Sequence, residues 1–520
     1  MLFSLLLTAA LAAEDARNPL PARIDSLIAA GYSDFAKFAA PPAPDAEFLR
    51  RVYLDLTGTI PSAAEVRAFL HDHSPGKRAR LINDLLDSPG YVRRVVWFLD
   101  TTLMERRPDA KVPRAAWEEY LRVAVAENRP YDALVREMLS SDGSDPKTRP
   151  AAKFFLDRNL ELDTVTRDIS RIFLGRNIQC AQCHDHPSIP DYRQDEYYGI
   201  AAFLNRSFLF PNAQSATAVI AEKAEGDVTY VSAFDKTKKQ NTTLPRVLGG
   251  QPIPEPKPEK GKEYKVAPAP NVRPVPTFSR RALLATAVTS RENPAFSRTA
   301  VNRIWAWLLG RGLVHAPDMD HSANPPSHPE LLDLLTVEFI RHGYDVKWLV
   351  RQIVLSETYQ RSSEIPAPLA TRDDIPPDRY LVGLLKPLSA EQLAFALARA
   401  GGQPDGSSVV PTFRELFGGR PGEAPSEFAP ELGQTLFLKY GGTVRGLLAG
   451  RAAQLAGLTD DSALAEELFL SVLSRYPTVE ETNEVTTALG AAPRTGKDRV
   501  TAVSELLWAL VASTEFRFNH

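Results

Sequence analysis

Cysteine is scarce in this sequence. Only two cysteines occur among 520 residues, and they lie three positions apart. The chain therefore lacks the two separated ligand pairs that structural zinc sites usually bring together. It also lacks, beyond its N-terminus, any continuous run of about 20 apolar residues, the length that a membrane-spanning helix needs. Once a signal peptide is removed, the protein is expected to have no transmembrane segment.

An excess of one charge is missing as well. Lys and Arg number 61 and Asp and Glu 64, which gives a net charge of -3. A chain with this balance has no basic field that would concentrate nucleic acid. The GxSxG, Walker, HExxH and Rossmann fingerprints are also absent. The sequence therefore predicts no nucleic-acid partner and identifies no hydrolase.

The first thirteen residues form an uncharged apolar run that ends in Ala10-Leu11-Ala12, in which the two alanines are small, followed by Ala13. Such an ending fits a signal peptidase site, so residues 1–13 are predicted to be a signal peptide and the protein to be extracytoplasmic, either periplasmic or secreted. The run is short and has no Lys or Arg before its apolar part. A misplaced start codon or a buried first helix is the alternative.

The rest of the chain is predicted to be mainly α. Apolar residues recur at helical spacing from about residue 45 to 204 and again from 278 to the end. Capping boxes are predicted where Ser or Thr precedes Glu or Gln by three positions, at Ser62, Ser327, Ser389 and Thr478. Helices are expected at residues 63–70, 77–86, 91–104, 114–127, 131–139, 162–173 and 331–341.

A different composition separates the two helical regions. Val228-Thr229-Tyr230-Val231 is typical of a strand, and prolines crowd between Pro252 and Pro276. We predict a helical domain at 14–208, a β-hairpin-containing, Pro-rich linker at 209–277 and a helical domain at 278–520. The alternative is a surface loop inside one larger domain. The Gly- and Pro-rich stretch from 404 to 440 is expected to be irregular.

Both cysteines fall in one motif, Cys180-Ala181-Gln182-Cys183-His184. Two thiols one helical turn apart can bond to the two vinyl groups of a porphyrin while the following His binds the iron. The motif predicts haem c, with Cys180 and Cys183 as attachment points and His184 as the proximal iron ligand. Covalent haem c is normally assembled outside the cytoplasm, which agrees with the predicted export.

The second axial position has several candidates. Met319 is one, and a methionine ligand would raise the reduction potential relative to two histidines. His315, His321 and His328 lie nearby in the sequence. Each of the four is more simply explained as structural. An open sixth position would instead favour ligand binding or sensing.

Two further interpretations of the motif stay open. Cys180 and Cys183 are spaced for a CxxC disulfide, which an oxidising compartment allows. Zinc held by Cys180, Cys183, His184 and His186 is the other. His186 is considered only in the zinc alternative, because two residues are too few to reach the opposite face of a porphyrin from His184. Either case would make the protein a metal- or disulfide-stabilised helical binding scaffold without electron transfer.

Acidic and aromatic residues surround the motif, and they allow a second alternative, an extracytoplasmic enzyme of unknown substrate. The simpler interpretation is that the acids are solvated turn residues and that the aromatic rings pack a pocket or the core. The residues are Asp185, Asp191, Asp195, Glu196, Tyr192, Tyr197, Tyr198 and Phe203.

Several stretches resemble one known family. Residues 50–61 (RRVYLDLTGTIP) and 180–187 (CAQCHDHP) resemble the planctomycete-type cytochrome-c-associated proteins. Residues 301–305 (VNRIW), 324–333 (NPPSHPELLD) and 516–520 (FRFNH) are similar to the partner domain of that family.

The resemblance implies two domains of unknown function in an exported protein. Many family members carry an additional N-terminal cytochrome-c domain that this sequence lacks, so electron exchange would need a separate extracytoplasmic redox partner protein. Relatives more often have Lys after the second His of the motif, where this chain has Pro187. That departure weakens any transfer of a role to His186.

Overall fold

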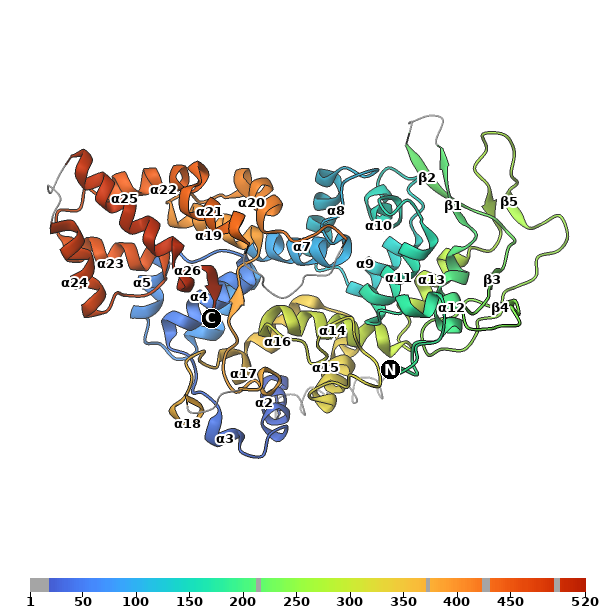
Figure 1. Cartoon of the computed structure of the whole chain (residues 1–520), viewed down its shortest axis with the longest axis horizontal. Helices are drawn as coiled ribbons and strands as arrows, with labels where there is room; N and C mark the ends of the chain where they lie inside the picture. Colours follow the sequence, from blue (N-terminus) through green and yellow to red (C-terminus); the bar gives the residue numbers. More distant parts are fainter. Residues whose placement is uncertain (1–17, 212–216, 371–374, 423–430, 491–495) are drawn as a thin grey trace, which may run out of the picture. The chain divides into compact units, whose positions relative to one another are not determined.

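The computed structural model describes residues 18–211, 217–370, 375–422, 431–490 and 496–520. The predicted signal peptide, residues 1–13, lies outside them. Helices make up 56% of the chain, and the strands form only two-stranded antiparallel sheets (Figure 1). The prediction of a mainly α protein with a short β-containing region is confirmed. In the described ranges, no helix is both long and apolar enough to cross a membrane.

The described chain forms two compact units, each assembled from separate segments. Unit 1 contains residues up to 98, 308–310 and 351–520, and unit 2 contains residues 99–307 and 311–350. Three helices extend across these sequence boundaries, namely α7 (Pro89–Met104), α14 (Pro294–Leu309) and α16 (Val346–Val354). The domain boundaries that the sequence predicts at residues 208 and 277 stay a prediction.

Where it is described, unit 1 is helical apart from one small sheet. In chain order its elements are α2 (Leu20–Ala30), α3 (Phe35–Phe38), α4 (Asp45–Thr57), α5 (Ala63–His71), α6 (Lys77–Leu86), α17 (Glu357–Gln360), α18 (Ala367–Ala370), η3 (Pro377–Arg379), β7 (Lys386–Pro387), α19 (Ala390–Ala400), η4 (Ser407–Val409), α20 (Val410–Phe417), α21 (Leu432–Tyr440), α22 (Gly442–Leu455), α23 (Asp461–Val472), α24 (Val479–Gly490), α25 (Lys497–Ala512), α26 (Thr514–Arg517) and β8 (Phe518–Asn519).

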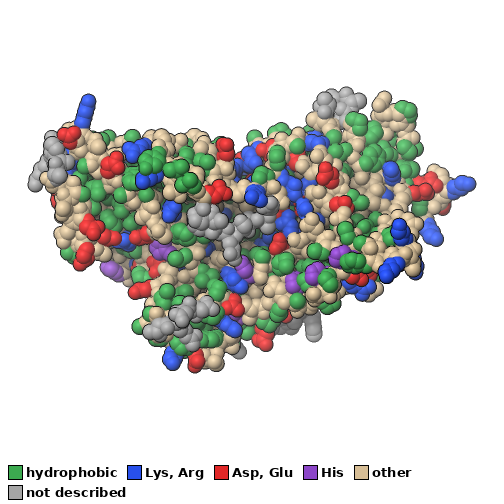
Figure 2. Space-filling view, in the orientation of Figure 1, with side chains coloured by type: hydrophobic (Ala, Val, Ile, Leu, Met, Phe, Trp, Pro, Cys, Tyr) green, Lys and Arg blue, Asp and Glu red, His purple; other side chains and the backbone are tan. Residues whose placement is uncertain are grey.

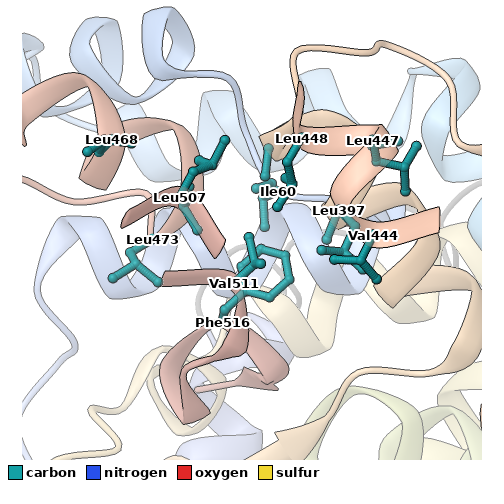
Figure 3. Packing of buried hydrophobic residues seen from close by; sticks show 14 of the residues in the cluster. Ile60, Leu397, Val444, Leu447, Leu448, Leu468, Leu473, Leu507, Val511 and Phe516 are labelled. Atoms are coloured by element: carbon teal, nitrogen blue, oxygen red, sulfur yellow. The ribbon is translucent and has the colours of Figure 1, made fainter. Parts of the chain in front are cut away.

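The core of unit 1 combines residues from distant parts of the chain. Figure 3 shows Ile60, which follows α4, among Leu397 of α19, Val444 of α22, Val511 of α25 and Phe516 of α26. All five side chains are at most 3% exposed. Because burial of apolar area is the main favourable term in folding, the N-terminal helices of this unit depend on the C-terminal ones.

Two arginines of α4 reinforce this connection. Arg50 is 1% exposed and donates to the carbonyl oxygens of Val472, at 3.1 Å, and Phe516, at 2.8 Å. Arg51 donates to the carbonyl oxygens of Tyr359 and Arg361, both at 2.7 Å. These side chains satisfy backbone acceptors that lie more than 300 residues away in the sequence.

One turn further along α4, Asp55 forms the centre of a buried polar cluster. Lys386 Nζ lies 2.7 Å from both carboxylate oxygens of Asp55. Tyr359 Oη donates to Oδ2 and Asn519 Nδ2 to Oδ1, both at 2.9 Å. Burial raises the pKa of Tyr359, and the negative charge of Asp55 adds to this effect. The phenol therefore stays a neutral donor.

The described residues of unit 2 combine helices with three small sheets. In chain order its elements are α8 (Arg114–Ala126), α9 (Tyr131–Ser140), η1 (Arg149–Ala152), α10 (Lys153–Leu156), α11 (Leu162–Leu174), η2 (Gln179–Gln182), α12 (Gln194–Leu204), β1 (Ser207–Pro211), β2 (Ala218–Glu222), β3 (Val228–Tyr230), β4 (Asn241–Thr243), β5 (Tyr264–Val266), β6 (Val275–Pro276), α13 (Arg280–Val288) and α15 (Pro329–Arg341).

The region between the two helical stretches contains more strands than the sequence predicts. The strand expected near Val228 is β3, which pairs antiparallel with β4. Two further hairpins form, β1 with β2 and β5 with β6.

On the face of the molecule shown in Figure 2, acidic and basic side chains are interspersed.

Three of the four predicted capping boxes are confirmed. At Ser62, Ser389 and Thr478 the hydroxyl accepts the third backbone N–H, and the following Glu or Gln accepts from the cap backbone. The box predicted at Ser327 is wrong, because the N-cap is His328. Pro329 needs no N–H partner and fits the first helical position, which moves the cap one residue past Ser327.

The prediction of an irregular stretch from 404 to 440 is wrong for much of its length. Helices α20 and α21 form there, and residues 423–430 lie outside the described ranges. Pro411 stands in the first turn of α20, where a missing N–H costs nothing. Phe413 and Leu438 bury one face of each helix in the core of unit 1. Tertiary packing thus outweighs the local Gly and Pro content.

Candidate functional site

The two cysteines lie in a single short turn of unit 2. Helix α11 ends at Leu174, its C-cap residue Gly175 has a left-handed φ of 70°, and the chain then enters η2. Cys180 and Cys183 are exposed, whereas Ala181 between them is completely buried. We call residues 180–184 the cysteine turn. Its backbone is anchored through Ala181 while both thiols face solvent.

His184, the last residue of the cysteine turn, has a defined tautomer. Its Nδ1 lies 2.8 Å from the carbonyl oxygen of Asp185. A carbonyl only accepts, so Nδ1 carries the proton and Nε2 of the neutral ring keeps its lone pair. The ring of Phe234 lies 4.5 Å from the imidazole centroid, tilted by 37°.

Helix α12 and strand β3 hold the cysteine turn in place. The carbonyl oxygen of Gln182 accepts hydrogen bonds from Tyr198 Oη, at 3.0 Å, and from Gln194 Nε2, at 3.3 Å. Tyr198 in turn stacks on Tyr230, with centroids 4.2 Å apart and planes 5° apart. Burial raises the pKa of Tyr198, so the phenol stays a donor. These aromatic residues serve the packing of the turn.

His186 has a structural role in the turn that follows. Its Nδ1 accepts the backbone N–H groups of Ser188, at 3.1 Å, and Ile189, at 3.0 Å. Nδ1 therefore carries no proton and is not available to a metal. Only Nε2 of His186 is left for the zinc alternative.

The described residues around the cysteine turn contain neither a preassembled cluster of three metal ligands nor a disulfide bond. No group of three or more His, Cys, Asp or Glu residues in the described ranges is placed to hold a metal ion. Cys180 and Cys183 are free thiols.

The loop of residues 315–324, which carries Met319, lies alongside the approach to the cysteine turn. Met319 forms an antiparallel β-bridge with Arg176. The N–H of Asp320 donates to the carbonyl oxygen of Gly175 at 2.9 Å. Asn324 Nδ2 closes the loop by donating to the carbonyl oxygens of His315 and Met319. Residues about 140 positions apart in the sequence are thus brought together.

His321 belongs to this loop and is 8% exposed. Its ring packs edge-on against Tyr192, with centroids 5.2 Å apart and planes at 74°. Within the described residues, the two ring nitrogens of His321 and the hydroxyl oxygen of Tyr192 have no hydrogen-bond partner. Burial raises the pKa of Tyr192 to about 12. The Nδ1 atom of His328, by contrast, lies 3.1 Å from Ser327 Oγ.

The acidic residues around the cysteine turn all have partners. Asp185 accepts the N–H of Gln194 at 2.7 Å, and Asp191 that of Ser322 at 2.5 Å. Asp195 and Glu196 both pair with Arg246, at 2.8 and 3.4 Å. These contacts favour the interpretation of the acids as turn and surface residues.

A buried charge cluster stiffens the helix that leads into the site. Asp168 of α11 is completely buried and lies 2.7 Å from Arg158, 2.9 Å from Arg107 and 3.2 Å from Arg171. Burial alone would raise the pKa of Asp168, but the surrounding guanidinium groups outweigh it and lower the pKa to about 2. Asp168 therefore stays charged and holds α11 against its neighbours.

Two family models match the chain. PSCyt2, described as a protein of unknown function (DUF1549), matches residues 23–208, and PSD1, likewise described as a protein of unknown function (DUF1553), matches residues 280–424. The chain carries this planctomycete-type pair of domains. No curated protein and no solved structure matches it.

The domain pair does not coincide with the two compact units. Unit 1 holds residues 23–98 of the PSCyt2 match together with the PSD1 residues from 351 onward. Unit 2 holds the rest of the PSCyt2 match, with the cysteine turn, and most of PSD1 up to residue 350. Each unit is thus built from both domains. Neither description names a chemistry, so the function has to be argued from the site.

Proposed function

We propose that this protein binds haem c covalently at the cysteine turn and acts outside the cytoplasm in electron transfer or redox sensing. The observation that carries the proposal is the arrangement of three side chains. Cys180 and Cys183 expose their thiols on either side of a buried alanine, and His184 directs an unprotonated Nε2 away from its bonded Nδ1.

The exposed thiols suit the attachment reaction. Each S–H would add across one vinyl group, so that an S–C bond would form and the thiol hydrogen would go to the neighbouring vinyl carbon. The addition needs no oxidant. It does need both sulfur atoms to be reduced and accessible, as they are in Cys180 and Cys183.

The hydrogen bond of His184 suits iron binding. Metal-bound imidazoles almost always donate their second ring N–H to a carbonyl or carboxylate, which fixes the tautomer and the ring orientation. The carbonyl oxygen of Asp185 accepts such a bond from Nδ1. Bound haem would supply a one-electron iron couple. The protein residues would hold and orient it, with a separate redox partner protein completing the exchange.

The test is a pyridine haemochrome spectrum of the full chain, exported in a host with haem-c assembly machinery. Wild type is expected to retain haem after denaturation, and the Cys180→Ser, Cys183→Ser double variant to lose it. His184→Ala is expected to lose the proximal ligand, whereas His73→Ala, an exposed histidine of unit 1, serves as the matched control. Folded wild-type protein without covalent haem would contradict the proposal.

A second function is favoured by the same free thiols. An exposed CxxC pair also suits a redox-active disulfide or a zinc ion, in a helical binding scaffold without electron transfer. Thiol titration and elemental analysis of the purified protein separate these cases. Oxidised thiols or bound zinc, together with no haem, would favour the scaffold.

A further inference from the structure

We infer that the side chains of Lys386 and Asn519 become joined by an intramolecular isopeptide bond, with Asp55 as the catalytic residue. The inference begins from the buried polar cluster of unit 1, where Asp55 bonds to an amine and to a carboxamide. An amine, a carboxamide and a group that moves protons between them are what this condensation needs. In the structure the three groups are in contact but not joined, which is the arrangement before the bond forms.

The strand pairing places the amine and the carboxamide next to each other. Lys386 of β7 is directly opposite Asn519 of β8 in the antiparallel register. The side chains of directly opposite residues project from the same face of a sheet, with Cβ atoms about 4.5–5.5 Å apart. A hydrogen bond of 3.0 Å from the N–H of Leu388 to the carbonyl oxygen of Arg517 fixes this register. The two side chains therefore start from adjacent positions and reach the same carboxylate.

Asp55 holds both reacting groups at one oxygen atom. Its Oδ1 accepts from Lys386 Nζ at 2.7 Å and from Asn519 Nδ2 at 2.9 Å. The two nitrogens are therefore no more than two hydrogen-bond lengths apart. Asn519 Oδ1, by contrast, is buried and has no partner within the described residues. The carboxamide is thus held through the nitrogen that leaves in the reaction.

The surroundings exclude water and favour the reactive form of the amine. Asp55, Tyr359 and Asn519 are each at most 2% exposed. Burial lowers the pKa of Lys386 and outweighs the opposing effect of the Asp55 charge. The ammonium group of Lys386 therefore gives up a proton more readily than that of an exposed lysine. Because the groups already touch, their reaction is intramolecular and avoids the entropy cost of an encounter.

The reaction balances without an oxidant or a co-reactant. Asp55 takes a proton from the ammonium group of Lys386, and the resulting amine attacks Cγ of Asn519 to form the new C–N bond. As the bond from Cγ to Nδ2 breaks, Asp55 delivers its proton to Nδ2 and takes a second proton from Nζ. The ammonia accepts that proton and leaves as ammonium. The products are one secondary amide and the restored carboxylate of Asp55.

The experiment is mass spectrometry of tryptic peptides from the folded full chain, digested after denaturation. Trypsin does not cleave between Lys386 and Pro387, so Lys386 lies in the peptide of residues 380–399, and Asn519 lies in the peptide that begins at residue 518. Wild type is expected to give these two peptides joined, at the sum of their masses less one ammonia. Recovery of the two peptides separately, each at its own mass, would overturn the inference.

Two variants test the roles of the reacting groups. Lys386→Arg keeps a positive charge beside Asp55 but removes the nucleophilic amine, so the peptides are expected separately. Asp55→Asn removes the carboxylate that moves the protons, and the peptides are again expected separately. Lys497→Arg changes an exposed lysine of α25 and, as the matched control, is expected to keep the joined peptide. A joined peptide from Asp55→Asn would overturn the catalytic assignment of Asp55.

A different product would also contradict the inference. If Lys386 were joined to the peptide of residues 52–67, which contains Asp55, with the loss of one water, then Asp55 and not Asn519 would be the acyl partner. The result is independent of the proposed function, because the cluster lies in unit 1 and the cysteine turn in unit 2. Protein without covalent haem is expected to give the same joined peptide.

Discussion

Helix α4 of unit 1 and the cysteine turn of unit 2 both belong to the stretches that resemble one family. Their side chains nevertheless differ in burial and in hydrogen bonding. In α4, Arg50, Arg51 and Asp55 are at most 4% exposed, and each bonds to distant parts of the chain. In the turn, Cys180 and Cys183 are exposed thiols. A family-like motif can therefore lie in the core or at the surface, and only the folded structure distinguishes the two cases.

The largest effect is expected at Asp55. Asp55→Asn removes the charge that pairs with Lys386, and breaking a buried ion pair in this way costs about 3–5 kcal/mol. The free energy of unfolding from denaturant titration measures it, with the exposed Asp498→Asn as control. If the free energy of unfolding fell by less than about 1 kcal/mol, α4 and the turn would no longer differ, because substitutions of surface residues change stability by that little.

The next effect concerns Asp168 beneath the site. Its folded pKa of about 2 lies below the unfolded value, so its contribution is complete above about pH 4 and is lost as the pH falls toward about 2. This difference corresponds to about 2 kcal/mol. Unfolding titrations across that pH range should show a wild-type decline that Asp168→Asn lacks. Equal declines would show that the charge cluster does not stabilise α11.

A smaller effect is expected at His186. His186→Ala removes the acceptor of two backbone N–H groups near the surface, which should lower the free energy of unfolding by about 1 kcal/mol. His186→Asn should recover most of this loss, because an Asn side-chain oxygen makes the same kind of turn bond. If instead His186→Asn removed bound zinc without changing stability, His186 would belong to the chemistry of the turn.

The smallest stability effect is expected at the cysteines themselves. Cys180→Ser and Cys183→Ser change exposed side chains, so each should alter the free energy of unfolding of the haem-free protein by less than about 0.5 kcal/mol. Thermal or denaturant unfolding of both variants measures it. Losses as large as that of Asp55→Asn would mean that the cysteines hold the fold together.

Local features of the fold could be predicted from the sequence. The helix expected at 77–86 matches α6 at both ends, and the box at Ser62 has the predicted reciprocal bonds, because spacing and capping act within a few residues. The failures at Ser327 and at α20 and α21 have a different origin. There, a neighbouring Pro or long-range burial decided the outcome.

The candidate site was predictable only in part. The CxxCH spacing predicts Cys180, Cys183 and His184 as candidate site residues, because they lie within five consecutive positions of the chain. The burial of His321 against Tyr192 could not be predicted, because it arises only when the 315–324 loop meets residues 175–177 and 191–192. The Asp55–Lys386 pair likewise joins residues 331 positions apart.

The most direct test is the mass of the tryptic peptide of residues 177–193, which contains both cysteines and His184, from exported protein under denaturing conditions. Covalent attachment predicts this peptide at its own mass plus one haem, with the haem remaining after denaturation. An unmodified peptide, or one lighter by two hydrogens from a Cys180–Cys183 disulfide, would contradict the account.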